Sequence, residues 1–275
     1  MPAYTLAPTD TVIAPDGTIL YRIQYADGTR GGYLQSTANL DPTSDARVLG
    51  DAQVYGNAQV LGDAQVLGGA RVLGGARVLG DAQVYGNAQV LGDAQVSGNA
   101  WVSGDARVSG NAQVSGNAWV SGNVWVSGNA WVYGDARVSG NAQVSGNAQV
   151  SGNAWVYGNA QVSGNAQVSG NAQVYGNAQV YGGARVLGDA WVYGDARVSE
   201  PQHCLTIGPL GSRAAILTVC RDSTLGISYA TGCFFGSRDA FLAAVEATHG
   251  NSSFGNAYAA AVMLADHVVP PYTQE

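Results

Sequence analysis

The chain of 275 residues contains no lysine, and all 12 of its basic residues are arginine. A P-loop lysine, a Schiff-base lysine and any side-chain amine nucleophile are therefore excluded. Charged residues make up only 11% of the chain, and the net charge is −7. Because there is no basic surface, binding to duplex nucleic acid or to an anionic membrane is not expected.

Long apolar segments and cysteines are also scarce. No apolar run approaches the roughly 18 residues of a transmembrane helix, and the first residues lack the cationic and apolar regions of a secretory signal. The three cysteines, Cys204, Cys220 and Cys233, form no Cys-x-x-Cys motif. An odd number of widely spaced cysteines predicts free thiols in a reducing compartment, so we expect a soluble, cytoplasmic protein.

A six-residue repeat fills residues 44–199 without insertion, giving 26 copies of Gly-(Asn/Asp/Gly)-Ala-x-Val-y. Valine occupies the fifth place in every copy, and alanine occupies the third place in every copy but one, where Val124 stands. The second place holds 14 asparagines, 9 aspartates and 3 glycines. Since these residue types best tolerate a positive φ, we expect the second place to form a left-handed corner.

Between corners, x-Val-y predicts a short strand whose valine points inward and whose neighbours point outward. Three corners close a triangular coil of 18 residues, so the 156 residues of the repeats give about 8.7 coils. This pattern is typical of a mainly β fold, a left-handed parallel β-helix. A right-handed β-helix, whose coils are usually longer and less regular, is the alternative.

Two flanking segments complete the expected organisation, because the open ends of a solenoid need caps. Residues 1–43 predict an N-terminal β-hairpin cap, with a strand over 18–25, a turn at Asp27-Gly28 and a return strand over 31–35. Residues 200–275 predict a small α+β C-terminal domain, in which two helices pack on one face of three strands. The expected strands cover 204–207, 214–220 and 225–231, and the expected helices cover 238–248, between caps at Ser237 and His249-Gly250, and 257–268.

Outward residues 18 apart are expected to stack in columns, and one face then collects 8 of the 13 outward aromatic residues of the repeats. Arg137 falls between Trp119 and Trp155 on that face, where a cation–π sandwich is expected. We interpret the face as a homo-oligomer interface; a stacking platform for sugar rings or bases and ladder packing without a partner are the alternatives. The candidate residues are Trp101, Trp119, Arg137, Trp155, Trp191, Tyr157, Tyr175 and Tyr193.

Polar residues of the repeats are interpreted as structural. The thirteen glutamines at the x place are expected to form side-chain ladders along the solenoid. The nine aspartates at the corners alternate with asparagine and lack the spacing of a calcium loop, so no metal site is expected.

The repeats contain no histidine and no inserted loop. The expected fold resembles that of the hexapeptide-repeat enzymes. These include trimeric acyltransferases, which use a histidine as general base, and γ-type carbonic anhydrases, which bind zinc through three histidines. Here the histidines are His203, His249 and His267, all outside the repeats. We therefore expect no catalytic residue and no cofactor in the solenoid, and fold analogy alone is not a guide to activity.

Short motifs outside the repeats carry a family resemblance. Gly31-Gly32-Tyr33-Leu34 and Asn39-Leu40 precede the repeats, and Gly211-Ser212-Arg213, Gly232-Cys233-Phe234 with Gly236, and Thr248-His249-Gly250 follow them. The chain resembles the YdcK-like hexapeptide-repeat proteins of bacteria and of phages or prophages. The resemblance implies the three-segment organisation and a cytoplasmic setting, the host cytoplasm for a phage protein, but no agreed activity.

The C-terminal domain holds the candidate ligand-binding residues, Gly211, Ser212, Arg213, Cys233 and His249. A glycine-serine-arginine turn suits a phosphate or carboxylate; the alternative is a turn whose arginine pairs with Asp222 or Asp239. Cys233 and His249 suggest a thiolate–imidazole pair. The alternative is that Cys233 is a buried cysteine and His249 caps a helix.

These observations favour a non-catalytic, homo-oligomeric solenoid, with a trimer expected. Its C-terminal domain is expected to bind a small anionic, nucleotide-like ligand or a host protein, and sequestration by a phage protein is one use. The alternatives are an acyltransferase-like enzyme with its site in the C-terminal domain, and the shaft of a phage virion fibre.

Overall fold

The computed structural model describes residues 4–273. The chain forms two compact units, and it passes from the first to the second between Gly146 and Asn147, inside the repeats. Both units contain coils built from two-residue strands, one per hexapeptide, that cover the x residue and the valine. Each unit is described in turn.

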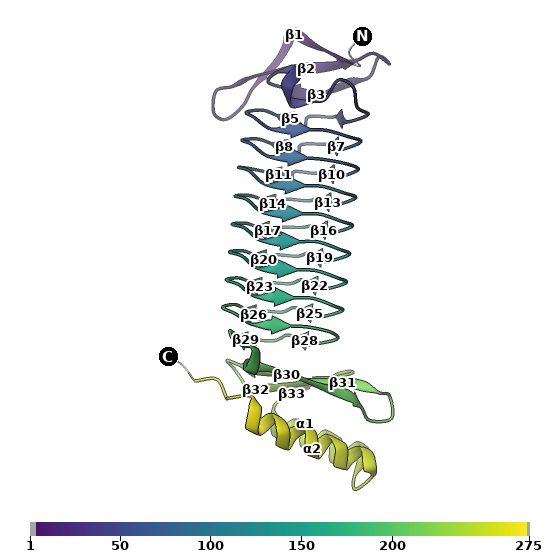
Figure 1. The fold of residues 1–275 in the computed structure, drawn as a ribbon, viewed down its shortest axis with the longest axis vertical. Helices are drawn as coiled ribbons and strands as arrows, with labels where there is room; N and C mark the ends of the chain where they lie inside the picture. Colours follow the sequence, from purple (N-terminus) through teal and green to yellow (C-terminus); the bar gives the residue numbers. More distant parts are fainter. Residues whose placement is uncertain (1–3, 274–275) are drawn as a thin grey trace. The chain divides into compact units, whose positions relative to one another are not determined.

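The first unit begins with the cap. Its strands β1 (Tyr4–Ile13), β2 (Ile19–Tyr25) and β3 (Arg30–Leu34) form an antiparallel meander, followed by a 3₁₀ turn at Thr37–Asn39 (Figure 1). The predicted hairpin is confirmed as β2 and β3, whereas β1 was not predicted. β3 then pairs in parallel with the repeat strand β5, so the meander continues directly into a sheet of the coils.

Side chains of the cap supply hydrogen bonds that the first coil cannot make to an earlier coil. The buried hydroxyl of Tyr25 accepts from the N–H of Val48 at 2.7 Å. The amide of Asn39 donates to the carbonyls of Gly56 and Ala58, at 3.0 and 2.8 Å. The otherwise open edge of the solenoid is thus covered, as expected for a cap.

The coils of the first unit place their strands in three parallel sheets, ordered β3-β5-β8-β11-β14-β17-β20, β4-β7-β10-β13-β16-β19 and β6-β9-β12-β15-β18. Strands 18 residues apart pair in register, as when Trp101 lies opposite Trp119. The strands are β4 (Arg47–Val48), β5 (Gln53–Val54), β6 (Gln59–Val60), β7 (Gln65–Val66), β8 (Arg71–Val72), β9 (Arg77–Val78), β10 (Gln83–Val84), β11 (Gln89–Val90), β12 (Gln95–Val96), β13 (Trp101–Val102), β14 (Arg107–Val108), β15 (Gln113–Val114), β16 (Trp119–Val120), β17 (Trp125–Val126), β18 (Trp131–Val132), β19 (Arg137–Val138) and β20 (Gln143–Val144).

The interior of the coils is made of the repeated valine and alanine, which are almost completely buried from Val48 to Val198. Each valine fills the space between sheets, and each alanine fits the narrower corner beside it. The parallel β-solenoid and the inward direction of the valines are thereby confirmed.

The corners differ from the prediction, because the positive φ belongs to the glycine at the first place and not to the second place. Gly104, for example, has a φ of 69°, and a Cβ there would lie 2.9 Å from the backbone nitrogen of Gly122 in the next coil. A side chain would therefore be strained by the backbone and would also collide with the neighbouring coil.

The second place forms side-chain ladders instead. Asn117 accepts from the amide of Asn99 at 3.2 Å and donates to the carboxylate of Asp135 at 2.8 Å, each 18 residues away. An aspartate accepts but does not donate when ionised, so it can end such a run but not continue it. Within residues 4–273 the glutamines share no side-chain hydrogen bond with one another, so the ladders belong to asparagine.

The second unit continues the same repeat with sheets ordered β23-β26-β29, β22-β25-β28 and β21-β24-β27. Its strands are β21 (Gln149–Val150), β22 (Trp155–Val156), β23 (Gln161–Val162), β24 (Gln167–Val168), β25 (Gln173–Val174), β26 (Gln179–Val180), β27 (Arg185–Val186), β28 (Trp191–Val192) and β29 (Arg197–Val198).

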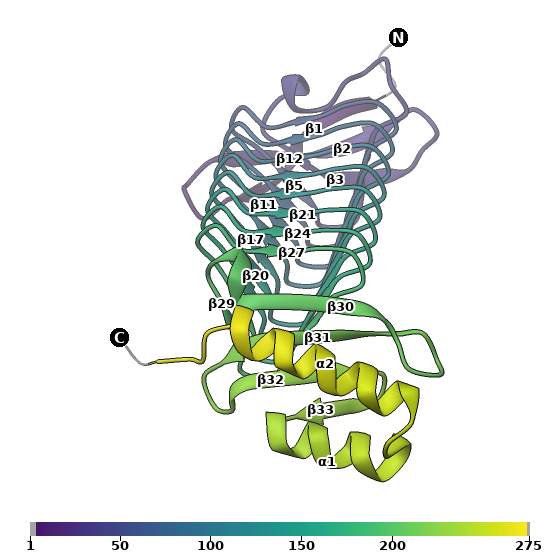
Figure 2. The ribbon, with the colours of Figure 1, turned by 60° about the horizontal axis from the view of Figure 1, so that its bottom comes forward.

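The C-terminal domain follows a 3₁₀ turn at Pro201–His203. It is an antiparallel sheet of β30 (Cys204–Leu210), β31 (Ala215–Asp222), β32 (Gly226–Thr231) and β33 (Phe234–Gly236), with α1 (Arg238–His249) and α2 (Ser253–Val268) on one face (Figure 2). The α+β class is confirmed, with a fourth strand that was not predicted. The core between sheet and helices contains Leu217, Val219, Tyr229, Phe241, Val245, Tyr258, Val262 and Ala265.

The cysteine prediction is wrong. Cys204 and Cys220 lie opposite each other in the antiparallel pair of β30 and β31, and a disulfide joins them. Cys233 is the free cysteine of the chain, and its side chain is exposed. Cys204 and Cys220 are 16 residues apart, and only the strand pairing brings them together.

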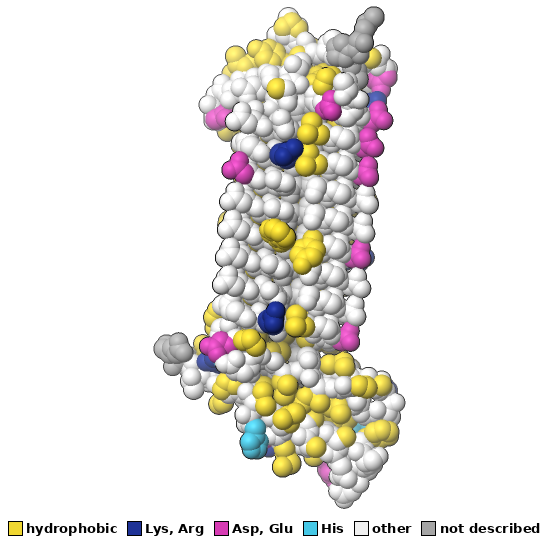
Figure 3. Space-filling view, viewed as in Figure 1, with side chains coloured by type: hydrophobic (Ala, Val, Ile, Leu, Met, Phe, Trp, Pro, Cys, Tyr) yellow, Lys and Arg dark blue, Asp and Glu magenta, His cyan; other side chains and the backbone are white. Residues whose placement is uncertain are grey.

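On the face shown in Figure 3, exposed hydrophobic side chains gather on the C-terminal domain, where Met263 and Leu264 of α2 are 65% and 49% exposed. None of the helices in the described part of the chain is both long and apolar enough to span a membrane.

Candidate functional site

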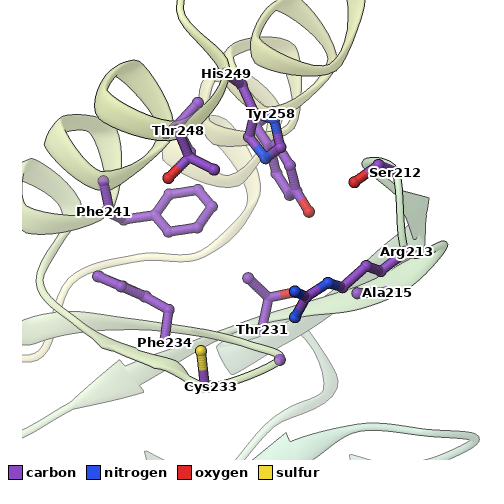
Figure 4. A pocket seen from close by; sticks show the side chains of 13 residues that line it. Ser212, Arg213, Ala215, Thr231, Cys233, Phe234, Phe241, Thr248, His249 and Tyr258 are labelled. Carbon is purple, nitrogen blue, oxygen red and sulfur yellow. The ribbon is translucent and has the colours of Figure 1, made fainter.

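A cavity of about 360 Å³ lies in the C-terminal domain, between the sheet and the two helices (Figure 4). Four of the five predicted ligand-binding residues line it: Ser212, Arg213, Cys233 and His249. The remaining lining residues are Ala215, Thr231, Gly232, Phe234, Phe241, Ala244, Val245, Thr248 and Tyr258.

Three connections of the fold bring these residues together. Ser212 and Arg213 lie in the turn between β30 and β31, and Cys233 lies in the turn between β32 and β33. His249 is the last residue of α1, one residue beyond the predicted helix end; the N-cap is Ser237, as predicted, and the C-cap is Gly250 alone. The site is therefore assembled from the turns of two hairpins and the C-terminal end of α1.

Gly211, the fifth predicted residue, acts through packing. Its φ is 69°, and a Cβ there would lie 2.5 Å from the hydroxyl of Tyr258 on α2. Glycine thus lets the β30–β31 turn approach the helix. Tyr258 itself was not predicted as a site residue, because its contact with the turn depends on how α2 packs.

Arg213 has no acidic partner among residues 4–273. Asp222 accepts instead from the N–H groups of Thr224 and Leu225, at 2.8 and 2.9 Å. Asp239 lies 3.7 Å from the guanidinium of Arg238. The alternative of a structural ion pair is therefore not found for Arg213, and its guanidinium points into the cavity toward Thr231 (Figure 4).

Aromatic rings form the opposite wall. The ring of Phe241 lies 5.3 Å from that of Phe234 and 5.7 Å from that of Tyr258, centroid to centroid. The imidazole of His249 stacks on Tyr258 at 5.6 Å, with its edge toward Phe254. These contacts hold the rings in fixed orientations around the cavity.

Cys233 and His249 share the cavity, but within the described residues no hydrogen bond joins them. The thiol is exposed, and the imidazole is engaged by aromatic rings. The described part of the chain therefore contains no hydrogen-bonded thiolate–imidazole pair of Cys233 and His249, and Cys233 is not a buried cysteine. The helix cap is formed by Gly250, whose N–H donates to the carbonyl of Glu246.

The predicted aromatic column is present in both units. In the first unit, Trp101 and Trp119 lie 5.5 Å apart in an edge-to-face arrangement, each 39% exposed. Arg137 lies over the ring of Trp119 at 5.8 Å, in a cation–π contact of the predicted kind. Tyr85 extends the group with its edge toward Trp101.

In the second unit the column is a stack of tyrosines. Tyr157, Tyr175 and Tyr193 follow each other at 4.8 and 4.6 Å with nearly parallel rings, and Trp155 lies beside Tyr157 at 6.5 Å. The burial of this stack raises the pKa of each phenol. Part of the predicted interface is thus occupied by packing within the chain.

The last residues of the column contact the C-terminal domain. The backbone N–H of Trp191 donates to the hydroxyl of Thr218 at 3.0 Å, and the hydroxyl of Tyr193 donates to the carbonyl of Phe234 at 3.3 Å. Phe234 also lines the cavity. The solenoid and the candidate site are therefore linked through β33.

One family model matches the chain, that of the YdcK β-solenoid repeat. Its matches cover residues 52–68, 82–98, 94–110, 112–128, 130–146, 142–158, 148–164, 160–176, 166–182, 172–188 and 178–194. No curated protein matches the chain significantly.

Proposed function

Since this chain is a β-solenoid repeat protein of the YdcK type, we propose that it is a binding protein whose C-terminal domain holds a small organic anion. The anion occupies the cavity between the sheet and the helices. The repeats serve as a rigid support and as a surface for assembly.

The observation that carries this proposal is the position of Arg213. A guanidinium that points into a cavity, without a carboxylate to neutralise it, attracts an anion and offers it two parallel hydrogen bonds. The cavity is within the range of small-molecule sites, and apolar walls with a few polar groups are typical of such sites.

Binding without turnover is part of the proposal. Nucleophilic catalysis by Cys233 needs a base within hydrogen-bonding distance, and the ring of His249 is held by Tyr258 instead. A protein of this kind sequesters its ligand, a use that suits a phage protein acting on a host metabolite. If the site were acyltransferase-like, acyl-CoA donors would release free thiol, and His249→Ala would abolish that release.

Assembly into a trimer through the aromatic column is the second part of the proposal. It is supported by the exposure of Trp101 and Trp119, because exposed aromatic groups of this size mark contact surfaces. Mass photometry at micromolar concentration is expected to give a trimer, and the double variant Trp101→Gln, Trp119→Gln a monomer. Trp131→Gln is the control, because Trp131 is also exposed but lies in another sheet. A monomeric wild-type protein would refute this part.

Ligand binding is tested on the full chain. Native mass spectrometry of protein purified from cell extract is expected to show one small anion per chain, and calorimetry with a panel of carboxylates, sulfonates and phosphates is expected to find a binder. Arg213→Gln should weaken binding, whereas Arg77→Gln, an exposed arginine of β9, should not. If no adduct is seen and no member of the panel binds, the proposal is wrong.

A further inference from the structure

The cavity has two chemically different ends. Arg213, Ser212 and Thr231 lie together at one end, and the rings of Phe234 and Phe241 lie at the other (Figure 4). A ligand that fills it must therefore be polar at one end and apolar along its body.

The charge of the site fits a single negative charge. Arg213 is the one arginine among the lining residues, the chain has no lysine, and no aspartate or glutamate lines the cavity. A phosphate carries up to two charges and three acceptor oxygens, and phosphate sites usually supply several backbone N–H groups or cations. Here Gly211, the glycine of the turn, packs against Tyr258 instead of forming part of a phosphate-binding loop.

The hydroxyl of Thr231 supports the same conclusion. Its oxygen is buried and has no hydrogen-bond partner within the described residues. A buried donor without a partner is unfavourable, and native proteins rarely keep one. Thr231 and Arg213 both line the cavity, so a carboxylate held by Arg213 could serve as the missing acceptor for this hydroxyl.

The opposite end favours a flat apolar group. The rings of Phe234, Phe241 and Tyr258 meet at angles of 58° and 82°, so they present both faces and edges to the cavity. Aromatic ligands bind such walls by stacking and edge-to-face contacts, with the loss of apolar surface from water as the main driving force.

On the basis of the proposed function, we infer that the ligand is a monoanionic carboxylate with a flat apolar body, of the aryl carboxylate class. Arg213 and Thr231 hold the carboxylate, and Phe234 and Phe241 contact the body. Phosphorylated ligands, nucleotides included, are poor occupants of this cavity.

The test is isothermal calorimetry of the full chain with four probes: 2-naphthoate, its uncharged analogue 2-naphthalenemethanol, inorganic phosphate and AMP. We expect 2-naphthoate to bind once per chain and at least about 10-fold more tightly than the other three, since a charge-assisted hydrogen bond contributes that much. Arg213→Gln should weaken its binding about 10- to 100-fold, and Thr231→Val about 3- to 10-fold. Thr231→Val conserves shape, and Thr206→Val, an exposed threonine of β30, is its control.

The outcomes separate this inference from the proposed function. Tighter binding of AMP or phosphate than of 2-naphthoate, with loss in Arg213→Gln, would overturn the carboxylate assignment and leave an anion-binding protein. Equal binding of the acid and the alcohol, or binding that Arg213→Gln does not change, would overturn the assignment of the charged end. Binding of none of the four probes, together with no adduct in native mass spectrometry, would refute both.

Discussion

The ring of Tyr193 lies 4.0 Å from the ring of Phe235, centroid to centroid, so the stack of tyrosines in the last coils ends on the C-terminal domain. Phe235 and its neighbour Phe234 point to opposite faces of β33, one toward the coils and the other toward the cavity. β33 therefore connects the packing of the solenoid with the wall of the candidate site.

Replacing Tyr193 by alanine is expected to destabilise the C-terminal domain by about 1–3 kcal/mol, because it removes two ring contacts and one hydrogen bond. Urea unfolding and the hydrogen exchange of β33 measure this effect. Tyr181→Ala is the matched control, since Tyr181 has the same place in its hexapeptide but is exposed in another sheet. Equal effects of the two substitutions would show that the stack adds nothing to the junction.

Gly104→Ala tests the corner geometry. The substitution places a Cβ on a backbone with positive φ and 2.9 Å from the next coil, so we expect a loss of about 1–3 kcal/mol in unfolding free energy. Gly183→Ala is the control, because Gly183 has no positive φ and a Cβ there meets nothing within 4 Å. Thermal unfolding compares the two variants. A Gly104→Ala protein as stable as Gly183→Ala would contradict the role assigned to the first place.

The corners also show how far the repeat could be interpreted from sequence. A strict period of six predicts which residues are buried and which lie opposite each other, because three strands close one coil. It does not say which of two adjacent small or polar residues has the positive φ. That choice depends on how closely one coil approaches the next, as at Gly104 and Gly122, and no local pattern encodes this distance.

The candidate site was predicted only in part, because residue chemistry can be recognised in the sequence but tertiary packing cannot. Ser212, Arg213, Cys233 and His249 were proposed from residue chemistry, and the fold brings them to one cavity. Tyr258 lies within the predicted helix 257–268, but it was missed as a site residue because its contact with Gly211 depends on how α2 packs against the β30–β31 turn. The Cys204–Cys220 bond was missed because it depends on the register of β30 and β31, which only pairing in three dimensions fixes.

Asn117→Asp tests the asparagine ladder. The new carboxylate cannot donate to Asp135 and faces it one coil away, so a lost hydrogen bond is joined by like-charge repulsion. We expect a loss of about 1–2 kcal/mol near neutral pH. Asp135→Asn keeps the acceptor for Asn117 and serves as the control. The two variants should differ less at pH 3, where carboxylates are protonated; a constant difference would contradict the charge argument.

Stability between pH 7 and 5 is expected to depend on His203. Burial, and then the positive charge of Arg221, lower the pKa of this imidazole below its ordinary value of 6.5, against a smaller opposing effect of Glu200. Its ring nitrogens lie 3.0 Å from the hydroxyl of Ser199 and 3.2 Å from the guanidinium of Arg221.

Because the folded pKa is lowered, the unfolded chain takes up a proton first as the pH falls. The contribution of His203 to stability is therefore complete above about pH 6.5 and declines as the pH decreases toward the folded pKa. Urea unfolding midpoints of the wild type should fall between pH 7.5 and 5.0, and His203→Asn should fall less. His267→Asn, at an exposed position on α2, is the comparison variant. An unchanged pH dependence in His203→Asn would show that acid sensitivity arises from other groups.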